Sequence, residues 1–385
     1  MKNNLLPLGT RDEFGSRASI KQNIVAVIQR HFEARGFSRI STPLLEKEQV
    51  FEPYQLGNYQ MYRFLDQDGD TLVLRPDLTL PIARFLSSTN IPLPQKFFYI
   101  GDIFRISRRL SGSYNESTQA GIELIGYKSI KAELECLMII NQLSDELLDS
   151  SVEIELGYAD FARGILRLLT DDTQLQEEIL QALYDKKIPT YESLISKFSN
   201  NELFEFLKRW PRLFGKPDVI FEQLTKFDLP VMIQVKIDAL KEIIEWISQT
   251  MPEQKVSLDL SSRAPQKYYT GLTFRGFSKD GAGYLFSGGR YDKLLANFQD
   301  QTESAIGMGI DIDVIADLAL QKKTKKTKTM IYFNNSQWNE AERVLAKIPH
   351  SVLSLADTKK QAQLEAEQAD AKFLDLTGGN ENDIE

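Results

Sequence analysis

The sequence predicts an α+β protein whose sheet is assembled from distant parts of the chain, with an all-helical insertion between them. Six short runs rich in β-branched and aromatic residues predict strands, three before and three after a long helical stretch. They lie at 71–74, 97–100, 121–125, 256–260, 272–276 and 284–287. Between about 161 and 250, apolar residues recur at helical spacing. Strands that flank a helical module favour a composite sheet over a regular βαβ repeat.

The first predicted element is a helix that ends at Gly36. Its apolar positions recur at helical spacing: Ile20, Ile24, Val27, Ile28 and Phe32. His31 flanks this apolar stripe. We interpret it as a partly buried helix histidine and not as a metal ligand, because no second histidine or cysteine lies nearby in the sequence.

The order of these elements predicts the domain organisation. We expect residues 1–160 and 251–320 to form one domain around the insertion at 161–250. Five lysines interleaved with threonines predict a linker over 321–329, because the aromatic residues of a nucleic-acid patch are missing there. The segment 330–385 is expected to form a short C-terminal unit. Its run Asp375–Gly379 favours a fraying turn over a phosphate loop.

Composition excludes several classes of function. The chain has 46 Lys plus Arg against 54 Asp plus Glu, a net charge of −8, which disfavours nonspecific nucleic-acid binding. Its single cysteine, Cys136, excludes an internal disulfide and a cysteine-cluster metal site. The two histidines leave little room for imidazole chemistry. We therefore expect no metal and no cofactor.

The chain also lacks an apolar run of about 18 residues and a signal-peptide core. We expect a cytoplasmic protein without membrane contact.

Four segments carry the residue types of a ligand site. They are 74–79, 98–123, 268–274 and 287–292. Their acceptors and aromatic groups are Asp77, Gln119, Glu123, Tyr268 and Tyr269, and their fixed positive charges are Arg75, Arg105 and Arg290. Acidic groups bind an ammonium, and arginine binds a carboxylate or phosphate. The set is typical of a site for an amino acid or an anionic, nucleotide-like ligand. The pattern Gly307-Met308-Gly309 is too short to support a dinucleotide site.

These segments together resemble the catalytic domain of histidyl-tRNA synthetase, a class II aminoacyl-tRNA synthetase, over about 5–160 and 255–318. The matching motifs are Gly9–Asp12, Ser41–Glu46 (motif 1), Phe104–Glu123 (motif 2), Tyr268–Gly271 and Gly288–Asp292. The resemblance implies a class II synthetase-like antiparallel sheet with flanking helices. It also implies self-association into a dimer core through motif 1.

The resemblance further implies a histidine-binding site. Asp77 takes the place of a substrate-contacting glutamate of that family, and several residues match those that hold histidine there. Together with Arg105, they make up the candidate site: Asp77, Thr79, Arg105, Gln119, Glu123, Tyr268 and Tyr269.

The chain departs from the synthetase pattern where ATP would be handled. Ser107 replaces the motif 2 glutamate, Ile312 replaces the motif 3 arginine, and Ala264 stands at the position of the catalytic arginine, with Arg263 one step away. Losing one such preorganised group costs on the order of a hundred- to a thousandfold in rate. The segment after the linker is also shorter than an anticodon-binding domain. We therefore expect no useful charging of transfer RNA and no catalytic residue.

A synthetase-like chain of this kind is similar to the ATP phosphoribosyltransferase regulatory subunit family. That resemblance implies a partner, the short-form catalytic subunit, which the chain would activate and place under histidine feedback in the first step of histidine biosynthesis. Two alternatives stay open: a divergent histidyl-tRNA synthetase and a stand-alone histidine-binding sensor. We expect the ligand's ammonium to face Asp77 or Glu123. The insertion is a candidate partner surface, with a purely structural role equally favoured.

Overall fold

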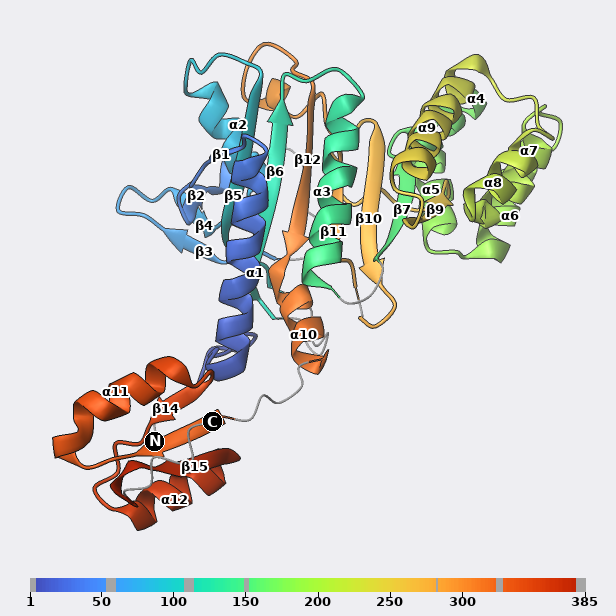
Figure 1. The fold of residues 1–385 in the computed structure, drawn as a ribbon. Helices are drawn as coiled ribbons and strands as arrows, with labels where there is room; N and C mark the ends of the chain where they lie inside the picture. The colour runs from blue at the N-terminus through green and yellow to red at the C-terminus, as the bar shows by residue number, and fades with distance from the viewer. Residues whose placement is uncertain are drawn as a thin grey trace. The chain divides into compact units, whose positions relative to one another are not determined.

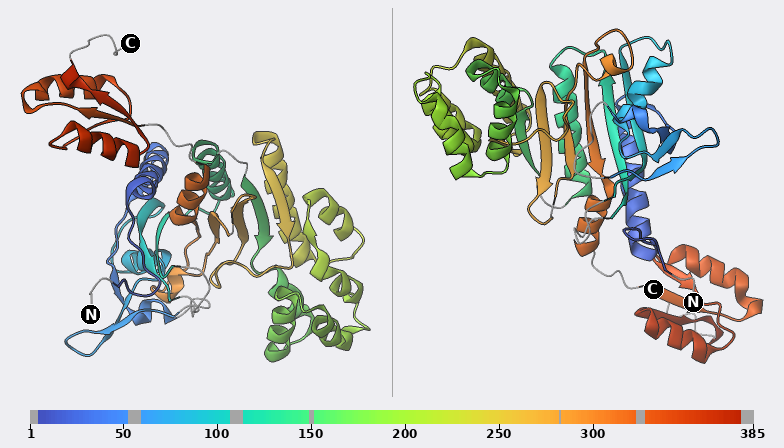
Figure 2. Two further views of the ribbon diagram at one scale, coloured as in Figure 1. Left: turned by 90° about the horizontal axis from the view of Figure 1, so that it is seen from below. Right: turned by 180° about the vertical axis from the view of Figure 1, so that it is seen from behind.

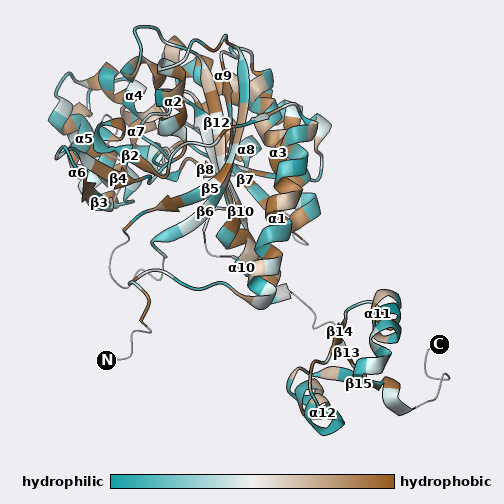
Figure 3. Cartoon of the chain, turned by 90° about the vertical axis from the view of Figure 1, so that its left-hand side faces the viewer, coloured by the Kyte–Doolittle hydropathy of each residue, from teal (hydrophilic) through white to brown (hydrophobic). Residues whose placement is uncertain are grey.

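The computed structural model describes residues 5–52, 60–106, 114–148, 152–281, 283–322 and 328–378. The chain divides into two compact units, Met1–Gln321 and Lys322–Glu385, and each is described by itself. Within the described ranges, no helix is long and apolar enough to cross a membrane. Hydrophilic and hydrophobic residues alternate along the helices that cover the large sheet (Figure 3).

The first unit is built on a nine-stranded sheet with the order β1-β5-β6-β12-β11-β10-β7-β9-β8. In that order the strands span Ser38–Arg39, Gln95–Phe104, Glu116–Ile125, Ala305–Asp311, Phe286–Arg290, Leu272–Ser278, Val152–Tyr158, Lys255–Asp259 and Phe214–Gly215. Most pairs are antiparallel, and the pairs β1–β5 and β7–β9 are parallel. Strands from before and after the insertion meet at the centre, where β6 pairs with β12. The predicted α+β composite sheet of the class II type is confirmed.

Helices α1 (Gly15–Ala34) and α3 (Lys131–Leu147) cross one face of this sheet (Figure 1). Phe32 of α1 packs against Phe98 of β5, with ring centroids 5.5 Å apart. Because side chains alternate along a strand, Phe97 and Tyr99 point to the opposite face. There a second core forms with Leu80 of α2 (Thr79–Ser87). Helix α10 (Ile312–Lys322) follows β12 directly.

A smaller sheet, with the order β2-β4-β3, lies beside the short helix η1 (Glu48–Val50). Its strands span Leu45–Lys47, Thr71–Leu74 and Arg63–Leu65. The predicted strand at 71–74 is therefore its central strand, and it hands the chain directly to the segment that contains Asp77.

The insertion folds as a helical module (Figure 2). Its helices are α4 (Phe161–Leu169), α5 (Thr173–Tyr184), α6 (Ile188–Ile195), η3 (Ser196–Phe198), α7 (Phe204–Arg209), η4 (Trp210–Arg212), α8 (Pro217–Leu224) and α9 (Val231–Thr250). Buried Trp210 packs against Phe161 and Phe206. Unlike the all-helical expectation, the insertion also contributes the two-residue strand β8. This strand pairs with β9, and Pro217 keeps helix α8 from starting before it, because a proline disfavours helix in the preceding Lys216.

The central strands β7 and β12 fall outside the six predicted runs, and the run at 284–287 becomes β11 only from Phe286. The pattern Gly307-Met308-Gly309 lies inside β12. Glycine is depleted in strands, which hides β12 from a propensity argument.

The second unit is a three-stranded parallel sheet with the order β14-β13-β15. Its elements are β13 (Lys328–Tyr332), η6 (Asn335–Gln337), α11 (Trp338–Lys347), β14 (Ser351–Leu353), α12 (Lys359–Gln368), β15 (Ala371–Asp375) and η7 (Leu376–Gly378). The linker predicted at 321–329 therefore includes the end of α10 and the start of β13. Residues 323–327 and the acidic end, 379–385, lie outside the described residues. In the turn after β15, Asp375 Oδ1 accepts hydrogen bonds from Thr377 N (2.9 Å) and Oγ1 (2.6 Å).

Candidate functional site

Glycines form the floor of a cavity on the α2 side of the large sheet. Opposing residues make a row across five neighbouring strands: Tyr99, Gly121, Gly309, Ser287 and Arg275. A Cβ on Gly121 would overlap the Tyr99 hydroxyl, and a Cβ on Gly309 would overlap the Gln119 amide. Only glycine leaves these polar groups their space above the sheet.

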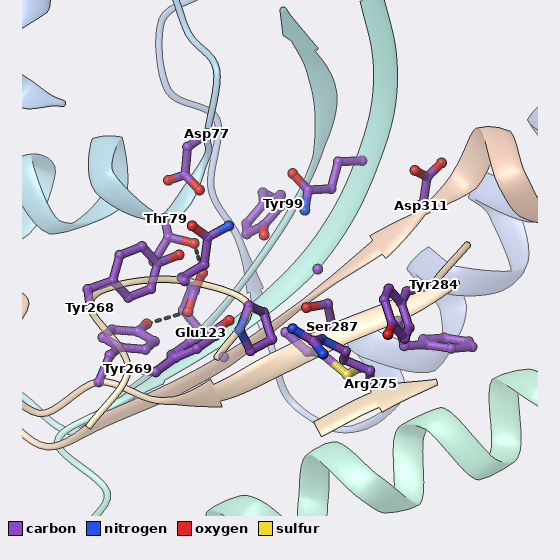
Figure 4. Close-up of a pocket in the computed structure, with 18 of the residues that line it drawn as sticks. Asp77, Thr79, Tyr99, Glu123, Tyr268, Tyr269, Arg275, Tyr284, Ser287 and Asp311 are labelled. Carbon is purple, nitrogen blue, oxygen red and sulfur yellow. Dashed lines mark hydrogen bonds between the residues drawn. The ribbon is translucent and has the colours of Figure 1, made fainter. Parts of the chain in front are cut away.

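The cavity has a volume of about 300 Å³ and brings together all the predicted ligand-binding residues (Figure 4). They are Asp77, Thr79, Arg105, Gln119, Glu123, Tyr268 and Tyr269. Asp77 and Thr79 come from the start of α2, Gln119 and Glu123 from β6, and the tyrosine pair from the segment before β10. Residues from three distant parts of the sequence therefore converge on one site.

Glu123 is the most buried carboxyl group of the cavity, with 1% of the residue exposed. Thr79 Oγ1 donates a hydrogen bond to Glu123 Oε1 at 2.7 Å, and the Tyr291 hydroxyl donates to Oε2. Burial raises the pKa of Glu123 to about 8, and nearby Asp77 acts in the same direction, while the two donors oppose it. A raised pKa favours the protonated form of Glu123 near neutral pH, and a cationic ligand beside it would favour its ionisation. Tyr291 lies in a motif that the sequence singled out, but its role depends on contact with β6.

Asp77 is the second buried acid of the cavity. Its Oδ1 accepts a hydrogen bond from Leu80 N at 2.8 Å in the first turn of α2. Burial raises the pKa of Asp77, and the charge of Arg105 opposes the rise. Asp77 and Glu123 together give one side of the cavity an affinity for groups that donate protons or carry positive charge.

Gln119 and the tyrosine pair complete this side. Gln119 Oε1 is buried and finds no donor among the described residues, so a ligand N–H would satisfy it. The rings of Tyr268 and Tyr269 are perpendicular, with centroids 5.1 Å apart, and form an aromatic wall. Burial raises the pKa of both tyrosines, so their hydroxyls stay protonated.

Two of the three arginines expected to serve a ligand have structural partners outside the cavity. Arg75 donates to the backbone oxygens of Thr42 (2.7 Å) and Asp102 (2.9 Å). Arg290 forms a two-point ion pair with Glu133, in which Nη2 lies 2.6 Å from Oε2. These arginines hold loops and α3 to the sheet, so the expectation that they offer charge to a ligand is wrong.

Arg105 and Arg275 are the arginines that line the cavity. Arg105 Nε donates to Pro76 O at 2.7 Å, beside the start of α2. Arg275, on β10, is a site residue that sequence reasoning missed. The sequence gives one signal for it. Arg275 follows Thr273 by two residues in a predicted strand, so both side chains belong to the same face of the sheet.

The departures from the synthetase pattern leave apolar or diverted side chains. Ile312 is fully buried at the start of α10, and Ala264 offers only a methyl group. Arg263 points to the insertion, where it donates to Gln181 Oε1 at 2.8 Å and lies over the Tyr184 ring. Ser107 lies outside the described residues. Within the part of the chain that the structure describes, no cluster of three metal-ligating side chains occurs.

Comparison with known proteins gives consistent results. The family model of histidyl-tRNA synthetase matches residues 9–315. The ATP phosphoribosyltransferase regulatory subunit of Lactiplantibacillus plantarum is 59% identical over 383 residues, with 100% of both chains covered. That of Lacticaseibacillus casei is 42% identical over 377 residues, with 98% of both chains covered.

Solved structures show the same fold. A Bacillus halodurans protein, described as an ATP phosphoribosyltransferase regulatory subunit/histidyl-tRNA synthetase, superposes with a TM-score of 0.81 at 25% identity, covering 97% of this chain and 98% of the other. Histidyl-tRNA synthetase from Nostoc superposes with a TM-score of 0.77 at 16% identity, covering 96% and 90%, which shows the fold alone.

Proposed function

Because the chain belongs to the ATP phosphoribosyltransferase regulatory subunit family, we propose that it activates a short-form catalytic subunit and places it under histidine feedback. The reaction, in which ATP and phosphoribosyl diphosphate give phosphoribosyl-ATP and diphosphate in the first step of histidine biosynthesis, belongs to the partner. This chain supplies no catalytic residue in the proposal, and the complex works in the cytoplasm.

One observation carries the proposal. The cavity combines two buried acids, an amide oxygen that no described residue pairs, and an aromatic wall, which suit an amino acid with a cationic or N–H-bearing side chain. At the same time, Ile312 and Ala264 stand where the synthetase pattern has arginines for ATP. The site is therefore equipped to bind a ligand and poorly equipped to activate it.

Histidine fits the proposal through its two nitrogen-bearing groups. Its ammonium would face Asp77 or Glu123, and Gln119 Oε1 would accept an N–H. The imidazole would lie against the tyrosine wall. Since burial raises the pKa of Glu123 to about 8, a positive charge on the ligand would be coupled to release of the Glu123 proton.

Feedback in this proposal is a coupling free energy between the cavity and the partner's active site, about 1–3 kcal/mol for allosteric pairs. The helical insertion is the surface that we propose for the catalytic subunit. It is supported by exposed apolar side chains at the start of α9, where Val231 is 81% and Val235 62% exposed.

A second copy of this chain is the proposed occupant of the small sheet β2-β4-β3. Exposed apolar side chains gather there, namely Leu44, Leu45, Phe64 and Leu65. Leu44 and Leu45 belong to motif 1, whose resemblance implies a dimer core, and Phe64 and Leu65 lie on β3 of the same small sheet, so self-association would cover them.

A divergent histidyl-tRNA synthetase is the second candidate, and one observation favours it. Arg275 brings a positive charge into the cavity although the expected positions lack one. This candidate requires histidine-dependent exchange of diphosphate into ATP. A stand-alone histidine sensor would bind histidine without affecting a phosphoribosyltransferase.

Reconstitution separates the three candidates. The chain is mixed with the short catalytic subunit of the same organism, and complex formation and phosphoribosyl-ATP production are measured. Activation on mixing, with no diphosphate exchange by the chain alone, supports the proposal. Exchange without activation supports the synthetase, and histidine binding without either supports the sensor.

A further inference from the structure

The cavity has a basic side that the predicted ligand-binding residues do not explain. Arg275 and Ser287 are directly paired across β10 and β11, and they lie on the other side of the cavity from Asp77 and Thr79 (Figure 4). Between the two sides, Gly121 and Gly309 leave the space above the sheet to the Tyr99 hydroxyl and the Gln119 amide. Asp77 and Glu123 therefore stand on one side of the cavity and Arg275 on the other, while a third lining acid, Asp311, lies on the side of Tyr284 (Figure 4).

We propose that Arg275 receives the carboxylate of the bound amino acid and so selects an α-amino acid over the corresponding amine. This inference rests on the proposed function, in which histidine occupies the cavity. In this proposal Arg275 binds the anionic group of the ligand, which Ala264, at the position of the synthetase arginine, cannot do.

The guanidinium of Arg275 is held in a fixed orientation and keeps donors to offer. Nη1 donates to Glu155 Oε1 at 3.2 Å, Nη2 donates to the backbone oxygen of Arg263 at 2.6 Å, and Cζ lies 4.9 Å from the centre of the Tyr284 ring. The other N–H groups, including that on Nε, meet no acceptor within the described part of the chain. A fixed guanidinium with unused donors suits a planar carboxylate.

The spacing of the strands suits one amino acid. β6, which carries Glu123, and β10, which carries Arg275, are separated by β12 and β11. Three strand spacings place their backbones roughly 14 Å apart. Both side chains line the cavity of about 300 Å³, Glu123 from β6 and Arg275 from β10. A zwitterion placed there would point its ammonium to the acids and its carboxylate to Arg275.

Arg105, the other arginine of the cavity, is less suited to this role. Its charge acts on both Asp77 and Asp311, two buried acids that line the same cavity, and lowers the pKa of each against the effect of burial. Arg105 is thus balanced by acids inside the cavity. The acid beside Arg275 is Glu155 on β7, which is not part of the cavity lining. Glu155 pairs with Arg275 from outside the cavity lining, so what Arg275 offers a ligand carboxylate is the remaining donors of its guanidinium.

The test compares L-histidine with histamine, which has the same ammonium and imidazole but no carboxylate. Calorimetry measures both affinities for the full-length wild type, Arg275→Gln and Arg275→Lys. We expect Arg275→Gln to weaken L-histidine binding by about 10- to 150-fold, as for lost charged hydrogen bonds, with histamine affinity unchanged. Arg275→Lys keeps the positive charge but loses the paired N–H donors of the guanidinium, so its affinity for L-histidine should lie between those of the wild type and Arg275→Gln. The control is Arg263→Gln, whose side chain points to the insertion.

The outcomes distinguish this inference from the function on which it rests. Equal losses for both ligands, or no loss, in a variant with wild-type thermal unfolding would overturn the role of Arg275 alone. If the wild type binds neither ligand, or if Gln119→Ala binds histidine as tightly as the wild type, the proposed histidine site is overturned, and this inference with it. If Arg275→Gln does not fold, Arg275→Lys decides by the same comparison of the two ligands.

Discussion

Gly307 lies directly across the β12–β6 ladder from Glu123, and a Cβ at position 307 would overlap the Glu123 carboxyl group. The Glu123 side chain can therefore take up this position only with glycine at position 307. Two residues further along, Gly309 lies across from Gly121 and leaves room for the neighbouring Gln119 side chain. The cavity depends on residues that contribute no chemistry of their own.

Gly307→Ala is accordingly expected to displace the Glu123 side chain. Overpacking at such a site costs about 1–3 kcal/mol of the free energy of unfolding, and histidine binding should weaken with it. Urea denaturation and calorimetry measure the two effects. Gly164→Ala in α4 is the matched control, because its new methyl group lies outside the cavity and comes no nearer than 3.1 Å to Lys236 Nζ and 3.4 Å to Ile233 Cδ1. Wild-type affinity in Gly307→Ala would show that Glu123 does not need this space.

The pKa of Glu123 predicts how stability depends on pH. Burial raises it from 4.5 to about 8, so between these values the folded protein holds a proton that the unfolded chain releases. The free energy of unfolding should therefore fall as pH rises through this window. The groups that face Glu123 are Thr79 and Tyr291, which donate to it, and Asp77, which adds to the rise.

Glu123→Gln removes this titration and should flatten the pH dependence of stability in the ligand-free protein. Urea denaturation at a series of pH values between about 4.5 and about 8 compares the slopes of variant and wild type. The other titrating groups are common to both proteins and cancel in the difference. Parallel slopes would mean that Glu123 is ionised in the folded protein across this range.

Arg290 is expected to act on stability and not on ligand choice. Its ion pair with Glu133 is buried, so Arg290→Met should destabilise the protein by about 3–5 kcal/mol by leaving a buried carboxylate unpaired. Adding Glu133→Leu should recover part of the loss. Urea denaturation of both variants checks this prediction. An Arg290→Met protein as stable as the wild type would contradict the structural role.

The small sheet predicts the state of association. Leu65 of β3 is 75% exposed in the single chain, and Leu65→Glu should shift the protein from dimer to monomer in light-scattering measurements, because a charge is costly in an apolar interface. Leu355→Glu is a matched control, since Leu355 is 77% exposed in the second unit. A wild type that is monomeric, or a dimer that tolerates Leu65→Glu, would place self-association elsewhere.

Much of the fold could be predicted because its signals are local. The strand runs at 71–74 and 97–100 and the helical spacing of α9 appear in short windows of sequence. The strand β12 could not be recognised in this way. Its glycines are there for Glu123 and Gln119, so the feature that makes the cavity removes the strand signal.

The residues of the candidate site could be predicted from its motifs. Which arginines face the cavity and which stabilise the fold could not. Arg290 finds its partner Glu133 157 positions away, and Arg75 is held by backbone oxygens. Arg275 looks like an ordinary strand residue until β10 is placed beside β11. Whether an arginine serves the fold or a ligand depends on tertiary neighbours, which no local pattern contains.

The most direct test of the account measures phosphoribosyl-ATP formation by the catalytic subunit mixed with this chain, at increasing histidine concentration, for the wild type and for Gln119→Ala. Gln22→Ala, at a solvent-exposed position of α1 outside the cavity, is the control. We predict that the wild type and Gln119→Ala both activate the catalytic subunit and that histidine inhibits the wild-type complex. The Gln119→Ala complex should need about 5- to 150-fold more histidine for the same inhibition. No activation on mixing, or equal inhibition of wild type and Gln119→Ala, would contradict the account.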